Sequence, residues 1–158
     1  MPTTLQFVSA ARDFIDVPYT HLGDRPDIAL DCIQFIKHAA KKCGARCDHW
    51  DIPPYGPHAD GIYMETFLDE NFVKVWELDV NTPRTIRNVE AFKLYLKGGD
   101  IICMGRSTSL QHPAVAAVGL YGWNIIHTRK DFGKVKEHSL AGKWSAMVRA
   151  IYRLPDVY

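Results

Sequence analysis

The chain has 158 residues, of which 47% are hydrophobic and 23% are charged, and this composition fits one compact domain with a full core. Nineteen basic and 18 acidic residues give a formal net charge of +1, so the sequence lacks the basic excess of a nucleic-acid-binding protein. We therefore expect a single domain over residues 1–158 and no nucleic-acid partner.

The sequence gives no sign of export or of membrane insertion. No basic segment precedes an apolar stretch in MPTTLQFVSAARDFID, and no apolar run approaches the roughly 18 residues that a membrane span needs. The cysteines are too few for a disulfide-dense scaffold and are expected as free thiols, at Cys32, Cys43, Cys47 and Cys103. We expect a chain made in the cytoplasm without a signal peptide and without a membrane partner.

The first half of the chain shows helical patterns. Thr3 or Thr4 is a suitable cap for a first helix, and Pro18 prevents this helix from continuing. Its apolar positions recur at helical spacing, at Leu5, Val8, Ala11, Phe14 and Ile15. A second helix follows Leu30-Asp31 and ends at Gly44, and its wide apolar face comprises Cys32, Ile33, Phe35, Ile36, Ala39, Ala40 and Cys43. Weaker helical patterns cover 62–72 and the stretch from Thr82-Pro83 through Val89, Phe92 and Leu96.

The second half of the chain shows strand patterns. Gly98-Gly99-Asp100 turns the chain into a strand at 101–104, and AVAAVGLYGWNIIHT predicts two strands joined at Gly119–Gly122. Further short strands are expected at 135–138 and 149–154. Helices followed by strands indicate an α+β fold, in which the helix that begins at Cys32 is central to the core.

Cys32 has two interpretations. A cysteine on the apolar face of a helix is commonly a structural residue, and this is how we interpret Cys43, Cys47 and Cys103. At the first turn of a helix, however, unpaired backbone N–H groups and the helix dipole favour a thiolate, as a nucleophile requires. The position of Cys32 is compatible with either role.

A nucleophilic thiol needs a base, and the seven histidines are the candidates. Five lie in segments that look solvated and are interpreted as surface residues: His21, His38, His49, His58 and His138. His112 begins one predicted strand and His127 ends the next, so the hairpin brings them side by side, either for catalysis or as ordinary cross-strand packing. Cys43, Cys47 and His49 do not form a recognised zinc pattern, and we expect no metal and no cofactor.

Motifs over most of the chain resemble those of the NlpC/P60 family of papain-like cysteine peptidases. The resemblance rests on ARDFIDVPYTHLGDRPDIALDCIQFIKHAAKKCG, with its "PY" loop and "DC" helix, and on GGDIICM…QHPAVAAVGLYGWNIIHT, with its histidine strand and "IH" strand. A "PPY" loop and the segment VKEHSLAGKWSAMVRAIYRLP resemble the branch encoded with phage tails and gene transfer agents. The resemblance implies a papain-like α+β fold in which the cysteine helix packs on an antiparallel sheet.

The resemblance also implies roles for individual residues. Cys32 corresponds to the nucleophile, His112 to the base and His127 to the residue that holds the imidazole in its working tautomer. Tyr19 and the backbone N–H of Cys32 would stabilise the oxyanion, and Asp31 would shape the entrance of the site.

The implied substrate is the stem peptide of bacterial peptidoglycan, cut between D-glutamate and a diamino acid. Membership of the tail branch would place the chain in a virion with other phage tail proteins. Two alternatives stay open on the same fold: a tail-tip structural or binding module without turnover, and an acyltransferase.

Two positions depart from the family pattern. Gln34 stands where relatives commonly have a small residue, and His127 follows His112 by 15 residues, which is longer than the usual spacing. An alignment without extra residues puts Val115 at the base position, and valine accepts no proton. Because side chains alternate along a strand, His112 and Val115 point to opposite faces, and we expect His112 to face Cys32.

Overall fold

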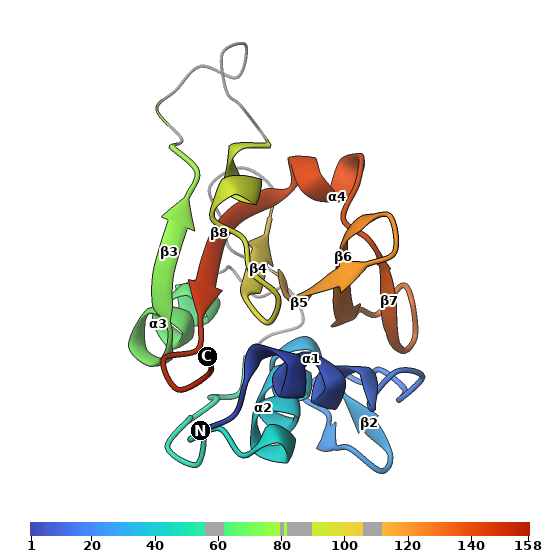
Figure 1. Cartoon of the computed structure of the whole chain (residues 1–158). Coiled ribbons are helices and arrows are strands. Elements are labelled where there is room, and N and C mark those ends of the chain that lie inside the picture. Colours follow the sequence, from blue (N-terminus) through green and yellow to red (C-terminus); the bar gives the residue numbers. More distant parts are fainter. Residues whose placement is uncertain (56–61, 80, 82–89, 106–111) are drawn as a thin grey trace.

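The computed structural model describes residues 1–55, 62–79, 81, 90–105 and 112–158. Its centre is a six-stranded sheet in the order β3-β8-β4-β5-β6-β7, in which every neighbouring pair is antiparallel (Figure 1). The strands are β3 (Val73–Glu77), β4 (Ile101–Met104), β5 (His112–Gly119), β6 (Gly122–Thr128), β7 (Val135–Ser139) and β8 (Val148–Arg153). A two-stranded ribbon pairs β1 (Asp24–Arg25) with β2 (Ala29–Leu30).

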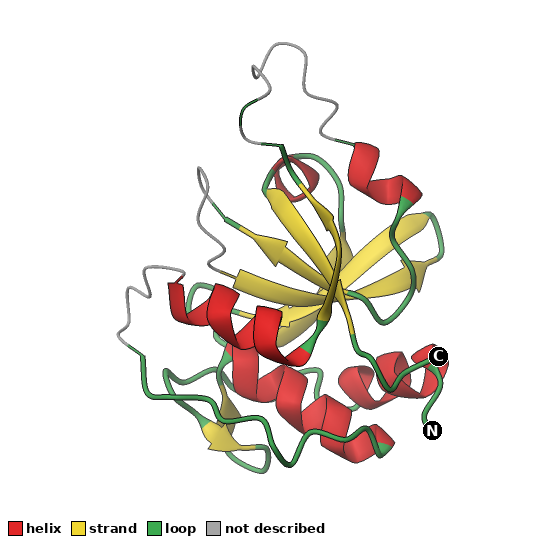
Figure 2. Ribbon diagram, turned by 90° about the vertical axis from the view of Figure 1, so that its left-hand side faces the viewer, coloured by secondary structure: helices red, strands yellow, loops and turns green. Residues whose placement is uncertain are grey.

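Two helices cover one face of the sheet. They are α1 (Thr4–Arg12) and α2 (Cys32–Cys43), which lie together on the same side in both views (Figures 1 and 2). A third helix, α3 (Ile62–Asn71), precedes β3. A short 3₁₀ helix, η2 (Ala91–Leu94), and α4 (Lys143–Ala146) lie on the other side of the sheet (Figure 1).

The ends of α1 and α2 follow from local sequence. Thr3 and Gln6 form a capping box at the start of α1, because each side chain accepts a hydrogen bond from the backbone N–H of the other. Asp31 caps α2 by accepting from the N–H groups of the first turn. Gly44 ends α2 in the left-handed conformation, at φ 84°, which costs glycine no Cβ clash.

Each face of the sheet carries its own hydrophobic cluster. On the α2 side, Val115 and Ala117 of β5 pack with Ile126 of β6 and with the buried face of α2. On the other side, Ala114 and Ala116 pack with residues that include Ile125, Phe92 and Leu96. Both faces of β5 are therefore buried, as expected for an interior strand that is covered on both sides.

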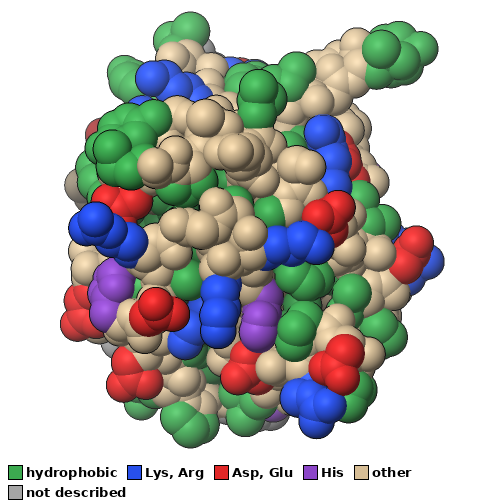
Figure 3. All heavy atoms as spheres, turned by 60° about the horizontal axis from the view of Figure 1, so that its bottom comes forward, with side chains coloured by type: hydrophobic (Ala, Val, Ile, Leu, Met, Phe, Trp, Pro, Cys, Tyr) green, Lys and Arg blue, Asp and Glu red, His purple; other side chains and the backbone are tan. Residues whose placement is uncertain are grey.

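The surface formed by the helices is mixed in charge. Acidic and basic side chains lie next to each other across this face (Figure 3). Several form ion pairs, among them Arg12 with Glu137 at 2.9 Å and Lys42 with Asp13 at 3.0 Å. The face carries no large field of one sign, which is what the net charge of +1 leads one to expect.

The tip of the β5–β6 hairpin is exposed and apolar. The β5–β6 hairpin presents three exposed apolar side chains, Val118, Leu120 and Tyr121, of which Tyr121 is 98% exposed.

The two termini lie side by side (Figure 1), and backbone hydrogen bonds join Thr4 N to Tyr158 O at 2.8 Å and Tyr158 N to Pro2 O at 3.2 Å.

The sequence predicted most of this architecture. The α+β class, the limits of the helix from Cys32 to Gly44, the helix after residue 61 and the hairpin at Gly119–Gly122 are confirmed. The first helix is shorter than predicted, because it ends at Arg12, and Leu5 is 80% exposed rather than part of the core. The strand β3 was not predicted, and the helical pattern from Thr82 lies largely outside the described residues.

None of the helices in the described ranges combines the length and the apolar character that crossing a bilayer would require.

Candidate functional site

Cys32 is the first residue of α2 and is half-buried. The segment Pro18 to Thr20 is fixed beside it by backbone bonds with Leu30, which donates to the carbonyl of Pro18 and accepts from the N–H of Thr20. Tyr19 lies within electrostatic range of the thiol, as do Tyr55 and Cys103 of β4. The "PY" loop, the "DC" helix and the loop that contains Tyr55 thus converge on the sulfur.

Asp31 is a buried cap of α2. It is 1% exposed, and its Oδ1 accepts hydrogen bonds from the N–H groups of Ile33, at 3.0 Å, and Gln34, at 2.8 Å. Its Oδ2 accepts from the Tyr55 hydroxyl at 2.6 Å. These three donors satisfy a buried carboxylate. The structure therefore supports Asp31 as a cap and as a neighbour of the thiol rather than as an exposed entrance residue.

The surroundings of Cys32 favour the neutral thiol over the thiolate. Burial, with the adjacent Asp31 charge as the second cause, raises the pKa of Cys32 to about 12, although the Tyr55 hydroxyl and backbone N–H groups act in the opposite direction. The expectation that the start of the helix lowers the pKa of this thiol is wrong for this structure. The dipole effect is modest at a helix end and does not outweigh desolvation and a neighbouring carboxylate.

His112 and His127 come together as the hairpin predicted. Nε2 of His112 lies 2.6 Å from Nδ1 of His127, and Nε2 of His127 lies 2.7 Å from Nε2 of His138 on β7. His138 continues the row, with Nδ1 at 2.9 Å from the carbonyl oxygen of Ser139. These three side chains are called the histidine row below. His138 had been interpreted as a surface residue, so its place in the row is a correction.

The histidine row lies on the face of the sheet away from α2. Along β6, Ile126 belongs to the cluster beneath α2 and Ile125 to the opposite cluster, and His127 has the same parity as Ile125. Along β5, the same alternation places His112 with Ala114 and Val115 with α2.

The structure therefore does not bring Cys32 together with its expected base. Within the described residues, no hydrogen bond joins Cys32 to a histidine, and the expected contact between His112 and the thiol is not made. The sequence left His112 and Val115 as alternatives for the side chain that faces α2, and the structure has Val115 there.

Two polar side chains near the α2 side of the sheet have a buried oxygen without a partner. Gln34 Oε1, in the first turn of α2, and Thr128 Oγ1, at the end of β6, make no hydrogen bond with any of the described residues. Thr128 follows His127 directly and has the parity of Ile126, so it faces the α2 side where His127 does not. Both are unusual, since buried polar atoms are nearly always paired.

Tyr55 and His21 are neighbours of the site that the sequence did not single out. Nε2 of His21 lies 2.9 Å from the carbonyl oxygen of Tyr55, and the two rings meet edge to face with centroids 5.3 Å apart. Tyr55 lies in an irregular, proline-rich loop that offers no periodic signal. Only its place in the "PPY" motif marked it, and that motif did not indicate a contact with Asp31.

The thiols of Cys43 and Cys47 form hydrogen bonds with backbone carbonyl groups. The Cys43 thiol donates to the carbonyl of Ala40 at 3.2 Å, and that of Cys47 to Lys37 at 3.8 Å. Where the structure describes the chain, no three histidine, cysteine or acidic side chains gather as metal ligands would.

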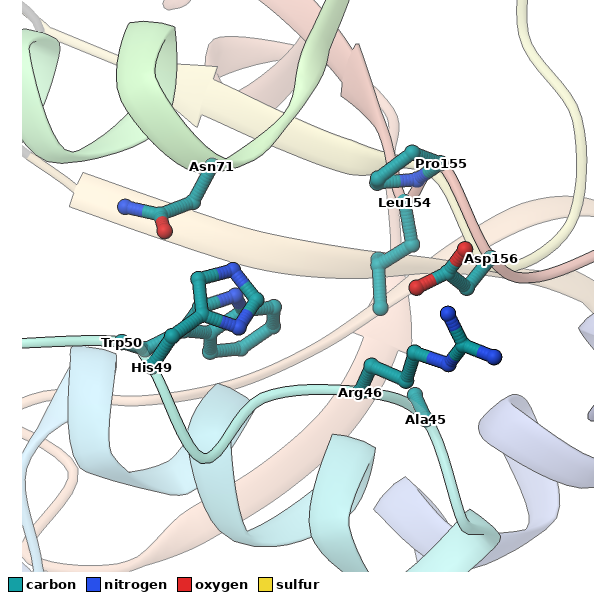
Figure 4. A pocket seen from close by; sticks show the side chains of 8 residues that line it. All are labelled: Ala45, Arg46, His49, Trp50, Asn71, Leu154, Pro155 and Asp156. Carbon is teal, nitrogen blue, oxygen red and sulfur yellow. The ribbon is translucent and has the colours of Figure 1, made fainter.

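A small pocket lies near His49, away from the thiol. It has a volume of about 20 Å³, and the side chains that line it come from the loop after α2, the end of α3 and the C-terminal segment (Figure 4). That volume is enough for about one water molecule and too small for a peptide.

Comparison with known proteins identifies the fold family. No protein family model matches the chain, and no curated protein matches it in sequence. Among solved structures, an NlpC/P60 family protein from Bacillus cereus ATCC 10987 is similar with a TM-score of 0.62 and 20% identity, over 97% of this chain and 40% of that one. The chain thus spans less than half of the Bacillus protein.

Two further structures match over nearly their whole length. The NlpC/p60 domain of the peptidoglycan hydrolase SagA has a TM-score of 0.60 and 20% identity, over 96% of this chain and 99% of that one. An N-acetylmuramoyl-L-alanine amidase from Bacteroides uniformis ATCC 8492 has a TM-score of 0.59 and 13% identity, over 96% and 98%. The chain therefore has the NlpC/P60 fold, as its motifs predicted.

Proposed function

We propose that the chain is a hydrolase that acts on the peptide part of bacterial peptidoglycan, with Cys32 as its nucleophile. The observation that carries this proposal is the position of Cys32 at the first turn of the central helix, beside Tyr19, in a fold shared with peptidoglycan hydrolases and amidases. A developing negative charge is favoured there by the helix dipole and by backbone N–H groups.

The chemistry proposed is acyl transfer through the thiol. A base removes the proton of the Cys32 thiol as the sulfur attacks the peptide carbonyl, and the N–H of Cys32 and Tyr19 stabilise the oxyanion. The C–N bond then breaks, and the leaving amine takes the proton from the base. Water hydrolyses the resulting thioester, which releases the acid and restores the thiol. His112, oriented by His127, is the proposed base. This role requires the His112 imidazole to reach the α2 side of the sheet, whereas strand alternation and the contact with His127 place it on the opposite side.

The proposal extends to finer points that rest on the sequence resemblance alone. These are the D-glutamyl–diamino acid bond as the bond cut, and a phage tail or gene transfer agent, with its other tail proteins, as the particle that carries the chain.

Binding of the wall peptide without turnover is the second candidate. The observation that favours it is the distribution of side chains about the sheet: Val115 lies beneath α2, while His112 and His127 occupy the other face. A neutral thiol without a base is a poor nucleophile, so an unchanged arrangement would bind a peptide and leave it intact.

Purified stem-peptide fragments, with mass spectrometry as the readout, test both candidates. The wild type is compared with Cys32→Ala and His112→Ala, and a second set of reactions contains an amine acceptor that would reveal acyl transfer. Cleavage that Cys32→Ala abolishes supports the hydrolase, and loss in His112→Ala as well supports its base. Retention of the peptide by wild type and variants without any cleavage would replace the hydrolase with the binding module.

A further inference from the structure

Two aromatic rings meet at the surface beside the histidine row. Phe132 lies in the turn between β6 and β7, Trp144 lies on α4, and their ring centroids are 5.8 Å apart. Both rings pack edge to face against the ring of His127, with centroids at 5.1 Å and 5.2 Å, and His127 is fully buried. The two rings are themselves only partly buried. They therefore form a platform that is supported from below and open to solvent above.

Three cationic side chains lie over this platform. Arg129 Cζ is 5.9 Å from the centroid of Phe132 and 5.5 Å from that of Trp144. Lys136 Nζ is 5.2 Å from the centroid of Phe132, and Lys143 Nζ is 5.3 Å from that of Trp144. The ring faces attract these cations and hold side chains that are otherwise flexible. Arg129, Lys136 and Lys143 are called the basic patch below.

The basic patch has little negative charge to offset it. Among the described residues, Asp131 is the only acidic side chain that pairs with any of the three, at 2.9 Å from Arg129 Nε. Lys136 and Lys143 are exposed, and Arg129 is partly exposed. Like charges that share two neighbouring rings repel each other, so an anion bound between them would stabilise the arrangement. The cations are already in place, which lowers the entropy cost of binding one.

The turn that carries Arg129 also borders the thiol. The Gly133 carbonyl accepts a hydrogen bond from the N–H of Tyr19 at 2.9 Å, and the N–H of Gly133 donates to the carbonyl of Arg129 at 3.0 Å. Tyr19 in turn bridges Leu30, two residues before Cys32. The basic patch and the proposed nucleophile are therefore joined through one tight turn at the edge of the sheet.

We propose that the basic patch is a subsite for carboxylate groups of the wall peptide. The inference rests on the proposed function, which names that peptide as the substrate. A peptide ends in a carboxylate, and a glutamate within it keeps a second one, because only one of its two carboxyl groups joins the next residue. The guanidinium of Arg129 binds a carboxylate through parallel N–H groups, and the two ammonium groups add positive charge.

The test is calorimetric titration of stem-peptide fragments into the full chain that carries Cys32→Ala, so that no cleavage occurs during the measurement. One fragment has free carboxylates, and the other is the same peptide with its carboxylates amidated. Arg129→Gln, Lys136→Gln and Phe132→Leu are compared in this background. Lys130→Gln is the matched control, because Lys130 is an exposed cation next to Arg129 and, in the described part of the chain, lies over no ring.

The inference predicts weaker binding of the acidic fragment when the patch is altered. The dissociation constant should rise about fivefold in Arg129→Gln and about threefold in Lys136→Gln. Phe132→Leu keeps every charge but removes the ring beneath Arg129 and Lys136, so it should weaken binding by about threefold as well. Lys130→Gln should bind like the parent. The amidated fragment should bind about tenfold more weakly and should not distinguish the variants.

Several results would overturn the inference. Equal affinity for the two fragments, or no binding of the acidic one at millimolar concentration, would remove the carboxylate from the ligand. Equal effects of Arg129→Gln and Lys130→Gln would show that net charge alone acts, and this pair decides if Phe132→Leu does not fold, as judged by circular dichroism. Inorganic phosphate that binds as tightly as the acidic fragment would assign the patch to phosphate instead.

Failure of the inference and failure of the hydrolase assignment can be told apart. Cleavage is measured separately, with the unsubstituted chain. Patch-dependent binding of an acidic fragment that this chain never cleaves would support the subsite and reject the hydrolase. Cleavage together with binding that no patch variant changes would support the hydrolase and reject the subsite.

Discussion

Acid should destabilise this fold through the histidine row. The bond from Nδ1 of His138 to the Ser139 carbonyl requires a proton on that nitrogen, so Nε2 of His138 accepts from Nε2 of His127, and Nδ1 of His127 accepts from His112. In this arrangement His127 is a neutral ring, with one nitrogen that donates and one that accepts. A further proton on His127 would set two N–H groups against each other at 2.6 Å in a fully buried position.

The direction of the effect follows from the pKa of His127. Burial, followed by the neighbouring His112, His138 and Arg129, lowers this pKa to about 2, below the value of about 6.5 in the unfolded chain. The unfolded state therefore binds the proton first. The stability contributed by neutral His127 is complete above pH 6.5 and is lost as the pH falls toward the folded value, by about 1.4 kcal/mol per pH unit.

From pH 7 to pH 4.5, His127 alone should remove roughly 2.5 kcal/mol from the free energy of unfolding. Urea unfolding followed by tryptophan fluorescence at several pH values measures it in the wild type, in His127→Gln and in His49→Gln, which changes an exposed histidine. His127→Gln should be less stable at pH 7 but should decline less steeply. Equal slopes in the wild type and His127→Gln would refute the reasoning, because other groups titrate alike in both.

Three further predictions concern single sites. Cys32→Ala should abolish stem-peptide cleavage while the free energy of unfolding stays within about 1 kcal/mol, because it trims a half-buried side chain at a helix start; an unchanged cleavage rate would exclude the nucleophile. Gly44→Ala should cost about 1 kcal/mol, since φ there is 84°, whereas Gly98→Ala, with ordinary φ and open space, should be near neutral in the same urea titration. Asp100→Ala should cost about 3 kcal/mol, because Asp100 is 1% exposed and accepts two bonds of 2.8 Å from Arg153, and the double variant with Arg153→Ala should lose less than the sum of the single ones.

The sequence was most informative where local chemistry decides the structure. Asp31 and Gly44 mark the ends of α2 because a cap and a left-handed residue act within one turn. Gly119 and Gly122 similarly mark the hairpin. Together with the quoted motifs, these local signals were enough to identify the NlpC/P60 fold.

The assembly of the site depends on which face each strand residue takes, and β5 gives no signal for this. Its residues from Ala114 to Ala117 are apolar and buried on both faces, so the usual alternation of polar and apolar side chains is missing. His112 was accordingly assigned to the wrong face relative to α2. Tyr55 and His138 were overlooked for a related reason, because their contacts are made between segments far apart in the chain.

The paired termini give the fold a useful modularity. Because Thr4 and Pro2 bond to the backbone of Tyr158, both ends leave the molecule at one point, and adjoining sequence in a longer polypeptide would extend from one side only. A short linker from Tyr158 to Met1 would close the chain into a ring with little strain. Reopening that ring between Leu120 and Tyr121, at the exposed hairpin tip, would give a circular permutant in which the thiol and its neighbours keep their surroundings.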